Sequence, residues 1–268
     1  MTLARELFGD ALSQALATRL AAPTLIVMLD VDGTLAPIAP RPEQAVVPPE
    51  TRRVIAALAA RPGVRVALVS GRAAADARRM VGVTNLWAIG NHGAETVGPD
   101  GEIDVDPRVA RYQPTVAQAA RKISSLVAAV PGVLLEDKTW TLSVHYRLAD
   151  PAVVPRLRGV VESVATGLGL RVMDGKAIFE VRPPVPVNKG TAVLALARRL
   201  GATDAGYLFV GDDVTDEDAF RLLRVQLPNA VTIKVGDPRT SAAEFAVRDP
   251  AAVRELLEAL LEQTGKPR

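Results

Sequence analysis

Carboxylates and hydroxyls follow short apolar runs in this sequence of 268 residues. Three such runs end in polar motifs, which are Asp30-Val31-Asp32-Gly33-Thr34, Ser70-Gly71-Arg72 and Gly211-Asp212-Asp213. Two carboxylates spaced like Asp30 and Asp32 can supply one nucleophile or metal ligand and one general acid/base. Asp212 and Asp213 add oxygen ligands, and a small carboxylate cluster suits Mg²⁺ that keeps some of its water.

A hydroxyl and a lysine complete the groups that an anionic substrate needs. Ser70 can donate a hydrogen bond, and Lys189, in Asn188-Lys189-Gly190 at the start of an expected helix, can supply positive charge. With the carboxylates, they describe a phosphate held against Mg²⁺, where metal, ammonium and hydroxyl offset the charge on the phosphoryl oxygens. Each motif alone is also consistent with a turn or a solvated helix start, but four of them at strand and helix ends favour a catalytic site.

The composition excludes several other chemistries. The sequence has no Cys and two His, so it offers no thiolate nucleophile, no disulfide and no three-histidine metal site. The net charge is +2, and two Trp, three Tyr and five Phe offer little for stacking bases, which disfavours nucleic acid as a partner. The apolar run 25–29 is far shorter than the roughly 18 residues of a membrane span. We therefore expect a cytoplasmic protein without a membrane partner.

These motifs need a scaffold that brings strand ends together. Short apolar runs alternate with helical periodicity, so strands are expected at 24–29, 64–69, 86–89, 207–210 and 230–235, and helices at 3–20, 48–60, 73–81, 190–200, 216–223 and 251–262. Such alternation predicts an α/β fold with a doubly wound, Rossmann-like parallel sheet and helices on both faces. Ligands bind at the carboxyl ends of such strands, so the sheet would gather the motifs.

Residues 107–185 have a different pattern and predict an inserted α+β unit, with 1–106 and 186–268 as one discontinuous core. Helices are expected at 109–130 and 153–168, and half-buried strands at 139–147, 170–173 and 177–182. In 139–147 apolar residues alternate with polar ones, so one face of the inserted sheet is expected to be polar. Asp174-Gly175 predicts a hairpin turn, and Thr215 with Asp218 has the spacing of a capping box.

The four motifs resemble those of the haloacid dehalogenase superfamily of phosphatases. The resemblance implies that Asp30 attacks phosphorus to form an aspartyl-phosphate, and that Asp32 protonates the leaving alcohol and later activates water. It implies that Thr34 and Ser70 hold phosphoryl oxygens and that Lys189 neutralises nucleophile and phosphate. It also implies an inserted cap that closes over the substrate. The implied ligands of Mg²⁺ are Asp30, the backbone carbonyl of Asp32, and Asp212, with Asp213 or Asp216 contributing directly or through water.

Further motifs resemble one subgroup, the trehalose-6-phosphate phosphatases. They are Ser70-Gly71-Arg72, Gly90-Asn91-His92-Gly93-Ala94-Glu95, Glu136-Asp137-Lys138, Val144-His145-Tyr146-Arg147, Glu180-Val181-Arg182-Pro183, Asn188-Lys189-Gly190 and the segment 211–220. The resemblance implies that the substrate is trehalose 6-phosphate, a small molecule. It implies a substrate-binding set of Arg72, Asn91, His92, Glu136, Lys138, His145, Arg147, Glu180 and Arg182. Charge-assisted hydrogen bonds from such side chains to sugar hydroxyls contribute roughly 1.5–3 kcal/mol each.

Two other functions stay open at this point. One is a phosphatase of another sugar phosphate, such as sucrose 6-phosphate, and the other is a non-catalytic sugar-phosphate sensor. All the catalytic positions are filled, which favours an enzyme. For His145, Arg147 and Arg182, the alternative to sugar binding is a solvated sheet face or a structural ion pair. Protein partners leave no signal in the sequence.

Overall fold

The structure is a computed structural model that describes residues 2–201 and 204–265. The chain divides into two units, Met1–Asp104 with Val187–Arg268 as unit 1, and Val105–Pro186 as unit 2. This division lies beside the boundaries expected for an insert at 107–185, and the role of that segment as a cap over the substrate stays a prediction.

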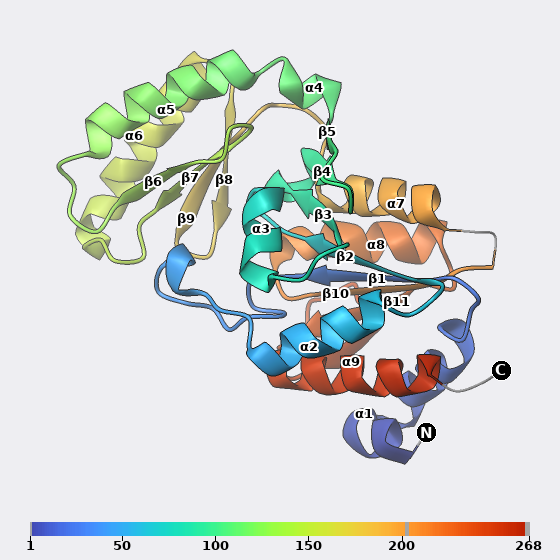
Figure 1. The fold of residues 1–268 in the computed structure, drawn as a ribbon. Coiled ribbons are helices and arrows are strands. Elements are labelled where there is room, and N and C mark those ends of the chain that lie inside the picture. The colour runs from blue at the N-terminus through green and yellow to red at the C-terminus, as the bar shows by residue number, and fades with distance from the viewer. Residues whose placement is uncertain (1, 202–203, 266–268) are drawn as a thin grey trace. The chain divides into compact units, whose positions relative to one another are not determined.

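Unit 1 is built on a mainly parallel sheet (Figure 1). In the described part of the chain its strand order is β12-β11-β10-β1-β2-β3-β4-β5, and β4 runs antiparallel to β3. The strands are β1 (Leu25–Asp30), β2 (Val64–Val69), β3 (Trp87–Gly90), β4 (Glu95–Val97), β5 (Ile103–Val105), β10 (Gly206–Gly211), β11 (Val231–Val235) and β12 (Phe245–Val247). The α/β fold with a parallel core is therefore confirmed.

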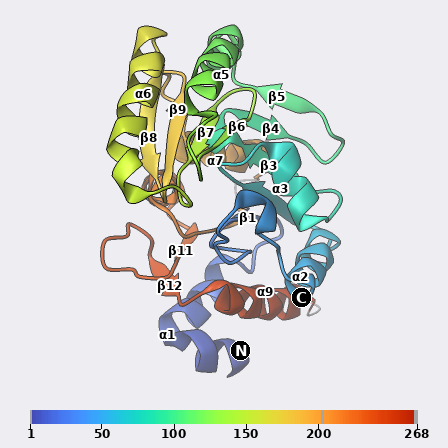
Figure 2. The same ribbon diagram turned by 90° about the vertical axis from the view of Figure 1, so that its left-hand side faces the viewer.

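Helices cover both faces of this sheet (Figures 1 and 2). One face packs against α1 (Thr2–Arg19), α2 (Pro49–Ala59), α3 (Ala74–Val81) and α9 (Pro250–Thr264). The other packs against α7 (Lys189–Leu200) and α8 (Glu217–Gln226). Alternate residues of β1 enter the two cores, with Val27 and Leu29 on one side and Ile26 and Met28 on the other. Burial on both faces explains why this strand is apolar throughout its length.

Unit 2 is a small antiparallel sheet backed by helices. Its strand order is β6-β7-β9-β8, formed by β6 (Leu134–Asp137), β7 (Leu142–His145), β8 (Arg171–Gly175) and β9 (Ile178–Arg182). Its helices are α4 (Pro107–Ala110), α5 (Gln113–Val127) and α6 (Val154–Gly167). One face of this sheet packs against α5 and α6 in a separate hydrophobic core, which includes Leu142, Val144, Phe179 and Val181. The opposite face carries the polar residues, as the alternation predicts.

Three local expectations are wrong. The single helix 109–130 is two, α4 and α5, because Pro114 at the start of α5 has no N–H to donate to the Ala110 carbonyl. The turn between β8 and β9 is Lys176-Ala177, and Gly175 is the last paired residue, opposite Ile178. That register keeps Val181 on the core face, which outweighs the turn propensity of Asp174-Gly175. The helix expected at 3–20 forms as α1 but is interrupted at Gly9, where φ is 78°.

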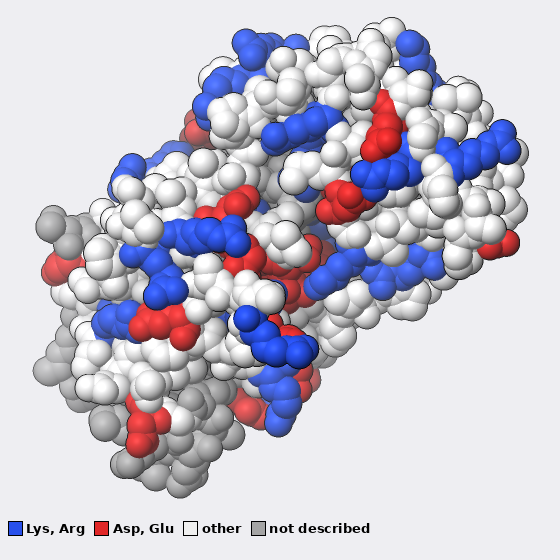
Figure 3. Space-filling model, turned by 180° about the vertical axis from the view of Figure 1, so that it is seen from behind, with Lys and Arg blue, Asp and Glu red and all other residues white. Residues whose placement is uncertain are grey.

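The surface charge is mixed in sign. Figure 3 shows Lys and Arg side chains interspersed with Asp and Glu over the face seen there, in keeping with the net charge of +2. No helix in the described part of the chain combines the length and apolarity that a membrane span requires.

Candidate active site

The sheet of unit 1 gathers the polar motifs at one edge. Asp30 is the last residue of β1, while Ser70 and Asp212 directly follow β2 and β10. These strands are neighbours and run parallel, with Leu29 paired to Val210 and Asp30 to Val69. Parallel pairing brings the carboxyl ends of the strands to the same side, so motifs far apart in sequence become adjacent.

A tight loop follows Asp30 and leaves no room for a side chain at Gly33. The carbonyl oxygen of Val31 accepts hydrogen bonds from the amides of Leu35 and Ala36, both at 2.9 Å. Gly33 adopts a φ of +86°, and a Cβ at this position would overlap the carboxylate of Asp212. The turn therefore needs glycine both for its left-handed backbone and for the close approach of Asp212.

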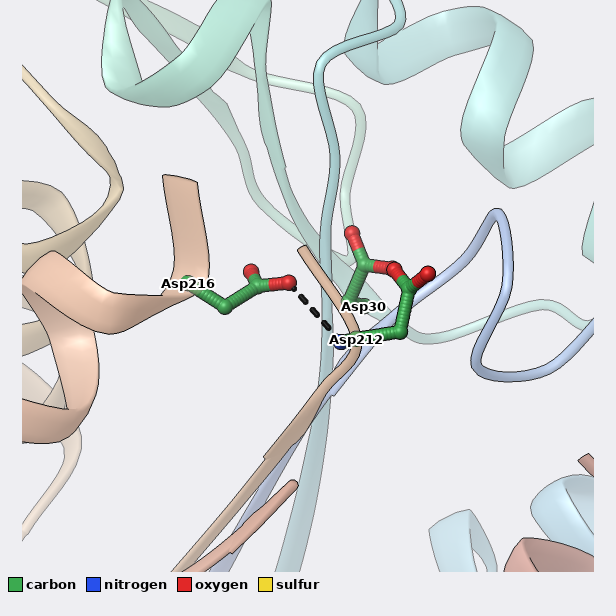
Figure 4. Close-up of side chains that lie close together, drawn as sticks. All are labelled: Asp30, Asp212 and Asp216. Atoms are coloured by element: carbon green, nitrogen blue, oxygen red, sulfur yellow. Dashed lines mark hydrogen bonds between the residues drawn. The ribbon is translucent and has the colours of Figure 1, made fainter. Parts of the chain in front are cut away.

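Three carboxylates and one ammonium form the centre of the site. Asp30, Asp212 and Asp216 each offer an oxygen, and these oxygens lie within 4.8 Å of one another. Figure 4 shows the carboxylates of Asp30 and Asp212 side by side, with Asp216 approaching from the start of a helix. Lys189 Nζ donates to Oδ1 of Asp30 at 2.7 Å and to Oδ1 of Asp216 at 2.8 Å. The Lys189 side chain is only 3% exposed, so this is a buried ionic cluster.

The cluster holds more negative than positive charge. Burial raises the pKa of Asp30 well above its usual value, Lys189 opposes that rise, and Asp216 and Asp212 add to it. Burial works against the charge of Lys189, yet Asp216 and Asp30 raise the pKa of this lysine above its usual value. Lys189 contacts two of the three carboxylates and the like charges still raise the pKa of Asp30, so a divalent cation at these oxygens would relieve the repulsion.

Unpartnered atoms point to what the site binds. Asp30 Oδ2 and Thr34 Oγ1 are buried and have no hydrogen-bond partner among the described residues. Buried polar groups are normally paired, so each needs a ligand to complete it. An all-oxygen donor set fits a hard cation such as Mg²⁺, and a hydroxyl beside it fits a phosphoryl oxygen. The residues present therefore suit both groups.

Asp216 also fixes the loop that carries Asp212. Its Oδ2 accepts from the amides of Asp212 at 3.0 Å and Asp213 at 2.9 Å, the first of which is drawn in Figure 4. The capping pair is thus Asp213 with Asp216, around the 3₁₀ turn Val214–Asp216, and the expected pairing of Thr215 with Asp218 is wrong. The reason is that the 3₁₀ turn precedes α8, so the capping residue is Asp213, two residues after the end of β10. Metal ligation by Asp213 and Asp216 stays a prediction.

Sequence reasoning missed Lys234, which donates to the backbone carbonyl of Asp212. Lys234 lies near the end of β11, the neighbour of β10, and is paired there with Gly211. The rule that found the other groups, polar residues at the ends of neighbouring parallel strands, also applies to Lys234.

A strained turn stands beside Ser70. Asn91 and His92 have φ values of 51° and 55°, in the left-handed region that side chains rarely adopt. The amides of these two residues donate to the carbonyls of Arg72 at 2.7 Å and Ser70 at 3.1 Å. Glu95 ends the motif that begins at Gly90 but was given no role there, and its Oε1 accepts from Asn91 Nδ2 at 2.9 Å. Strain of about 1–3 kcal/mol per residue persists only where such contacts hold it, and it is typical of functional sites.

The polar face of unit 2 brings together most of the residues expected to bind sugar. Ser143 is paired with Glu136 on β6 and with Glu180 on β9, so the three lie in one row across the sheet. Residues two positions further along each chain share that face, which adds Lys138, His145 and Arg182. Lys138 Nζ lies 3.3 Å from both carboxylate oxygens of Glu180.

Hydrogen bonds and ion pairs join these residues in two groups, one around Glu180 and one around Glu136. Glu180 also accepts from Ser143 Oγ at 2.7 Å, and Arg182 lies 3.7 Å from its other oxygen. His145 Nε2 and Glu136 Oε2 are 2.8 Å apart. Sequence reasoning did not propose Ser143 as a site residue, although Ser143 lies two positions before His145 and therefore on the same face of the strand.

Arg147, another residue of unit 2 expected to bind sugar, has its contact outside this polar row. It is exposed, and its Nη2 donates to the carbonyl of Lys176 in the β8–β9 turn at 2.8 Å. A role for Arg147 in substrate binding stays a prediction.

Acid is expected to weaken unit 2 through Glu136. Burial opposes ionisation, but the hydrogen bond from His145 and the charge of Lys138 lower the pKa of this carboxyl below its usual 4.5. Because the folded pKa is lowered, the stabilisation is fully present above 4.5 and is lost as pH falls through the folded value. Urea unfolding at about pH 6 and about pH 3.5 should show a smaller acid loss in Glu136→Gln than in the wild type. An identical acid loss in the two proteins would contradict this assignment.

Gly33→Ala is expected to disrupt the site with only a modest loss of stability. Alanine at a positive φ costs about 1–2 kcal/mol, and the added Cβ must also displace the Asp212 carboxylate. Displacement of such a group by about 1 Å can lower turnover by roughly two orders of magnitude. Gly101→Ala is the matched control, since its φ is +90° but nothing lies within 4 Å of the added atom. Equal turnover in the two variants, measured as phosphate release, would contradict the prediction.

A family model and curated relatives match most of this chain. The model of the trehalose-phosphatase family matches residues 28–251. The trehalose-phosphate phosphatase of Mycobacterium avium (strain 104) is 37% identical over 245 residues, which are 88% of this chain and 62% of that protein. The chain thus spans less than two-thirds of the length of this curated relative.

Solved structures agree with the sequence comparisons. A trehalose-6-phosphate phosphatase related protein superposes with a TM-score of 0.78 at 30% identity, covering 89% of this chain and 97% of that one. The C-terminal domain of a C. albicans trehalose-6-phosphate phosphatase gives a TM-score of 0.78 at 25% identity, covering 94% and 97%.

Proposed function

Because the chain belongs to the trehalose-phosphatase family, we propose that it hydrolyses trehalose 6-phosphate to trehalose and inorganic phosphate, a step of trehalose biosynthesis. The observation that carries the chemistry is the buried cluster at the strand ends, where Asp30 has one oxygen on Lys189 and the other without a described partner. A carboxylate held in this way can attack a phosphorus atom bound beside it. The family match supports the choice of substrate.

The reaction proceeds in two displacements. Asp30 Oδ2 bonds to phosphorus, the ester bond from phosphorus to the sugar oxygen breaks, and Asp32 gives its proton to that oxygen. Asp32 then takes a proton from water, the water oxygen bonds to phosphorus, and the bond to Asp30 breaks to release phosphate. Thr34 and Ser70 donate to phosphoryl oxygens, and Lys189 balances their charge.

Mg²⁺ is the cofactor of this proposal. Asp30, the carbonyl of Asp32, and Asp212 would hold the ion, with Asp213 or Asp216 acting directly or through water. When bound, it supplies charge neutralisation for the phosphoryl oxygens. The surplus negative charge of the cluster supports a divalent ion.

The sugar is recognised by the polar row of unit 2. Glu136, Lys138 and Glu180 would hydrogen-bond the hydroxyls of the distal glucose, since charged donors and acceptors bind hydroxyls well. We assign the remaining substrate contacts to Asn91, His92, His145, Arg147 and Arg182. Residence in the cytoplasm stays a prediction from the sequence.

A panel of phosphate esters tests the proposal. Phosphate release from trehalose 6-phosphate, sucrose 6-phosphate and glucose 6-phosphate is measured with Mg²⁺ and after exhaustive chelation. We expect trehalose 6-phosphate to have the highest kcat/KM and activity to need the metal. Equal turnover of glucose 6-phosphate would refute the specificity, and a preference for sucrose 6-phosphate would favour the alternative phosphatase. Binding without turnover of any ester would favour a sensor.

A further inference from the structure

Arg72 forms a two-pronged ion pair with Asp32. Its Nε donates to Asp32 Oδ2 and its Nη2 to Asp32 Oδ1, both at 2.7 Å. The Arg72 side chain is 16% exposed and that of Asp32 is 32% exposed. Paired bonds of this kind fix the orientation of a carboxylate group.

Both partners are held in place by the backbone around them. Arg72 Nη2 also donates to the carbonyl of Pro42 at 2.9 Å, and the Arg72 amide donates to Ser70 Oγ at 3.1 Å. Asp32 lies in the tight loop after β1 and forms a bridge with Ala36. The guanidinium is therefore a fixed fork against which the Asp32 side chain is oriented.

We propose that Arg72 is a positioning residue that acts through Asp32, rather than a group that binds the sugar directly. The inference rests on the proposed function, in which Asp32 protonates the leaving sugar oxygen and later activates water. A general acid or base works only when its oxygen is aimed at the reacting atom. Each Asp32 oxygen accepts one hydrogen bond from Arg72 and keeps a second lone pair, which can carry the proton that is transferred.

This role predicts a dependence on the leaving group. A sugar alkoxide is a poor leaving group and needs the proton of Asp32 as the ester bond breaks, whereas p-nitrophenolate is stable without one. Loss of Arg72 should therefore slow the first displacement with trehalose 6-phosphate much more than with p-nitrophenyl phosphate. A group that held the phosphoryl oxygens would affect both esters alike.

Single-turnover and burst kinetics of Arg72→Ala, Arg72→Lys, Asp32→Asn and Arg72→Ala/Asp32→Asn test the proposal. Arg72→Ala should lower the rate of trehalose release at least about tenfold, with KM changed less than about threefold. Its burst of p-nitrophenol should slow less than about threefold. Arg72→Lys should not restore the rate, because an ammonium lacks the fork. The double variant should lose no more than Asp32→Asn.

Three results would overturn the proposal: equal losses with both esters, a higher KM at unchanged kcat, or full rescue by Arg72→Lys. Arg52→Ala is the matched control, since Arg52 is also half-buried and donates to a backbone carbonyl, that of Val47 at 2.9 Å. It should leave both rates unchanged.

A second measurement needs no turnover. If Arg72 and Asp32 are paired in solution, the melting temperatures of the two single variants and the double variant should be non-additive. Additive shifts would overturn the pairing itself. If the wild type releases phosphate from no ester, the proposed function fails while this measurement still decides whether the pair exists.

Discussion

Asp30→Asn is expected to lower phosphate release by about four orders of magnitude or more. The amide oxygen is far less nucleophilic than a carboxylate, so no covalent intermediate forms. An amide is close in shape to the carboxyl group and keeps an oxygen that can accept from Lys189. The variant should therefore fold, and it should still bind the substrate.

The same variant is expected to melt no lower than the wild type when metal is absent. The pKa of Asp30 in the folded protein lies above its usual 3.8. Protonated Asp30 therefore contributes to the stability of the fold below pH 3.8, and this contribution is lost as pH rises through the folded pKa. Asparagine stays neutral, which removes that cost at neutral pH. Asp218→Asn is the control, because Asp218 lies on the neighbouring α8 and its side chain is 46% exposed beside Arg221. Turnover by Asp30→Asn above about a hundredth of the wild-type rate would refute the nucleophile assignment.

The composition of the catalytic cluster follows from the sequence for a simple reason. An apolar strand buried on both faces can be recognised from its residues, and parallel strands bring their carboxyl ends to one edge. The sequence alone therefore predicts that Asp30, Ser70 and Asp212 lie together. Lys189 could be assigned to the same cluster because Asn188 marks the start of a helix. The structure shows this cap, in which the Asn188 side chain accepts from the Thr191 amide at 2.9 Å.

The sequence does not predict which side chains pair with one another within the site. Arg72 was expected to contact substrate, yet its guanidinium lies on Asp32, because rotamers and the position of the Pro42 carbonyl decide which acceptor it meets. Asp216 likewise has one oxygen on Lys189 and the other on two amides, since a 3₁₀ turn precedes α8. Such choices depend on contacts between segments far apart in sequence, and a motif read along the chain does not contain them.

Lys189→Met is expected to cost about 3–5 kcal/mol of the free energy of unfolding in metal-free protein and to abolish turnover. Methionine has a similar length but no charge, so Asp30 and Asp216 would be left buried without their shared cation. Burial of an unpaired charge costs much more than the pair itself contributes. Arg198→Met on the same helix removes an exposed cation that contacts Gln226, and it should change stability by less than about 0.5 kcal/mol.

A second substitution separates charge balance from loss of packing at this position. In Lys189→Met/Asp216→Asn one of the two orphaned carboxylates becomes neutral, while its amide oxygen can still accept from the amides of Asp212 and Asp213. Urea unfolding of the metal-free proteins should therefore show the double variant to be more stable than Lys189→Met, while turnover stays abolished because no ammonium faces the phosphate. If the loss came from packing alone, Asp216→Asn would restore nothing, since it fills none of the space that the lysine leaves. Equal stability of the single and double variants would thus mean that Lys189 does not balance the charge of Asp216.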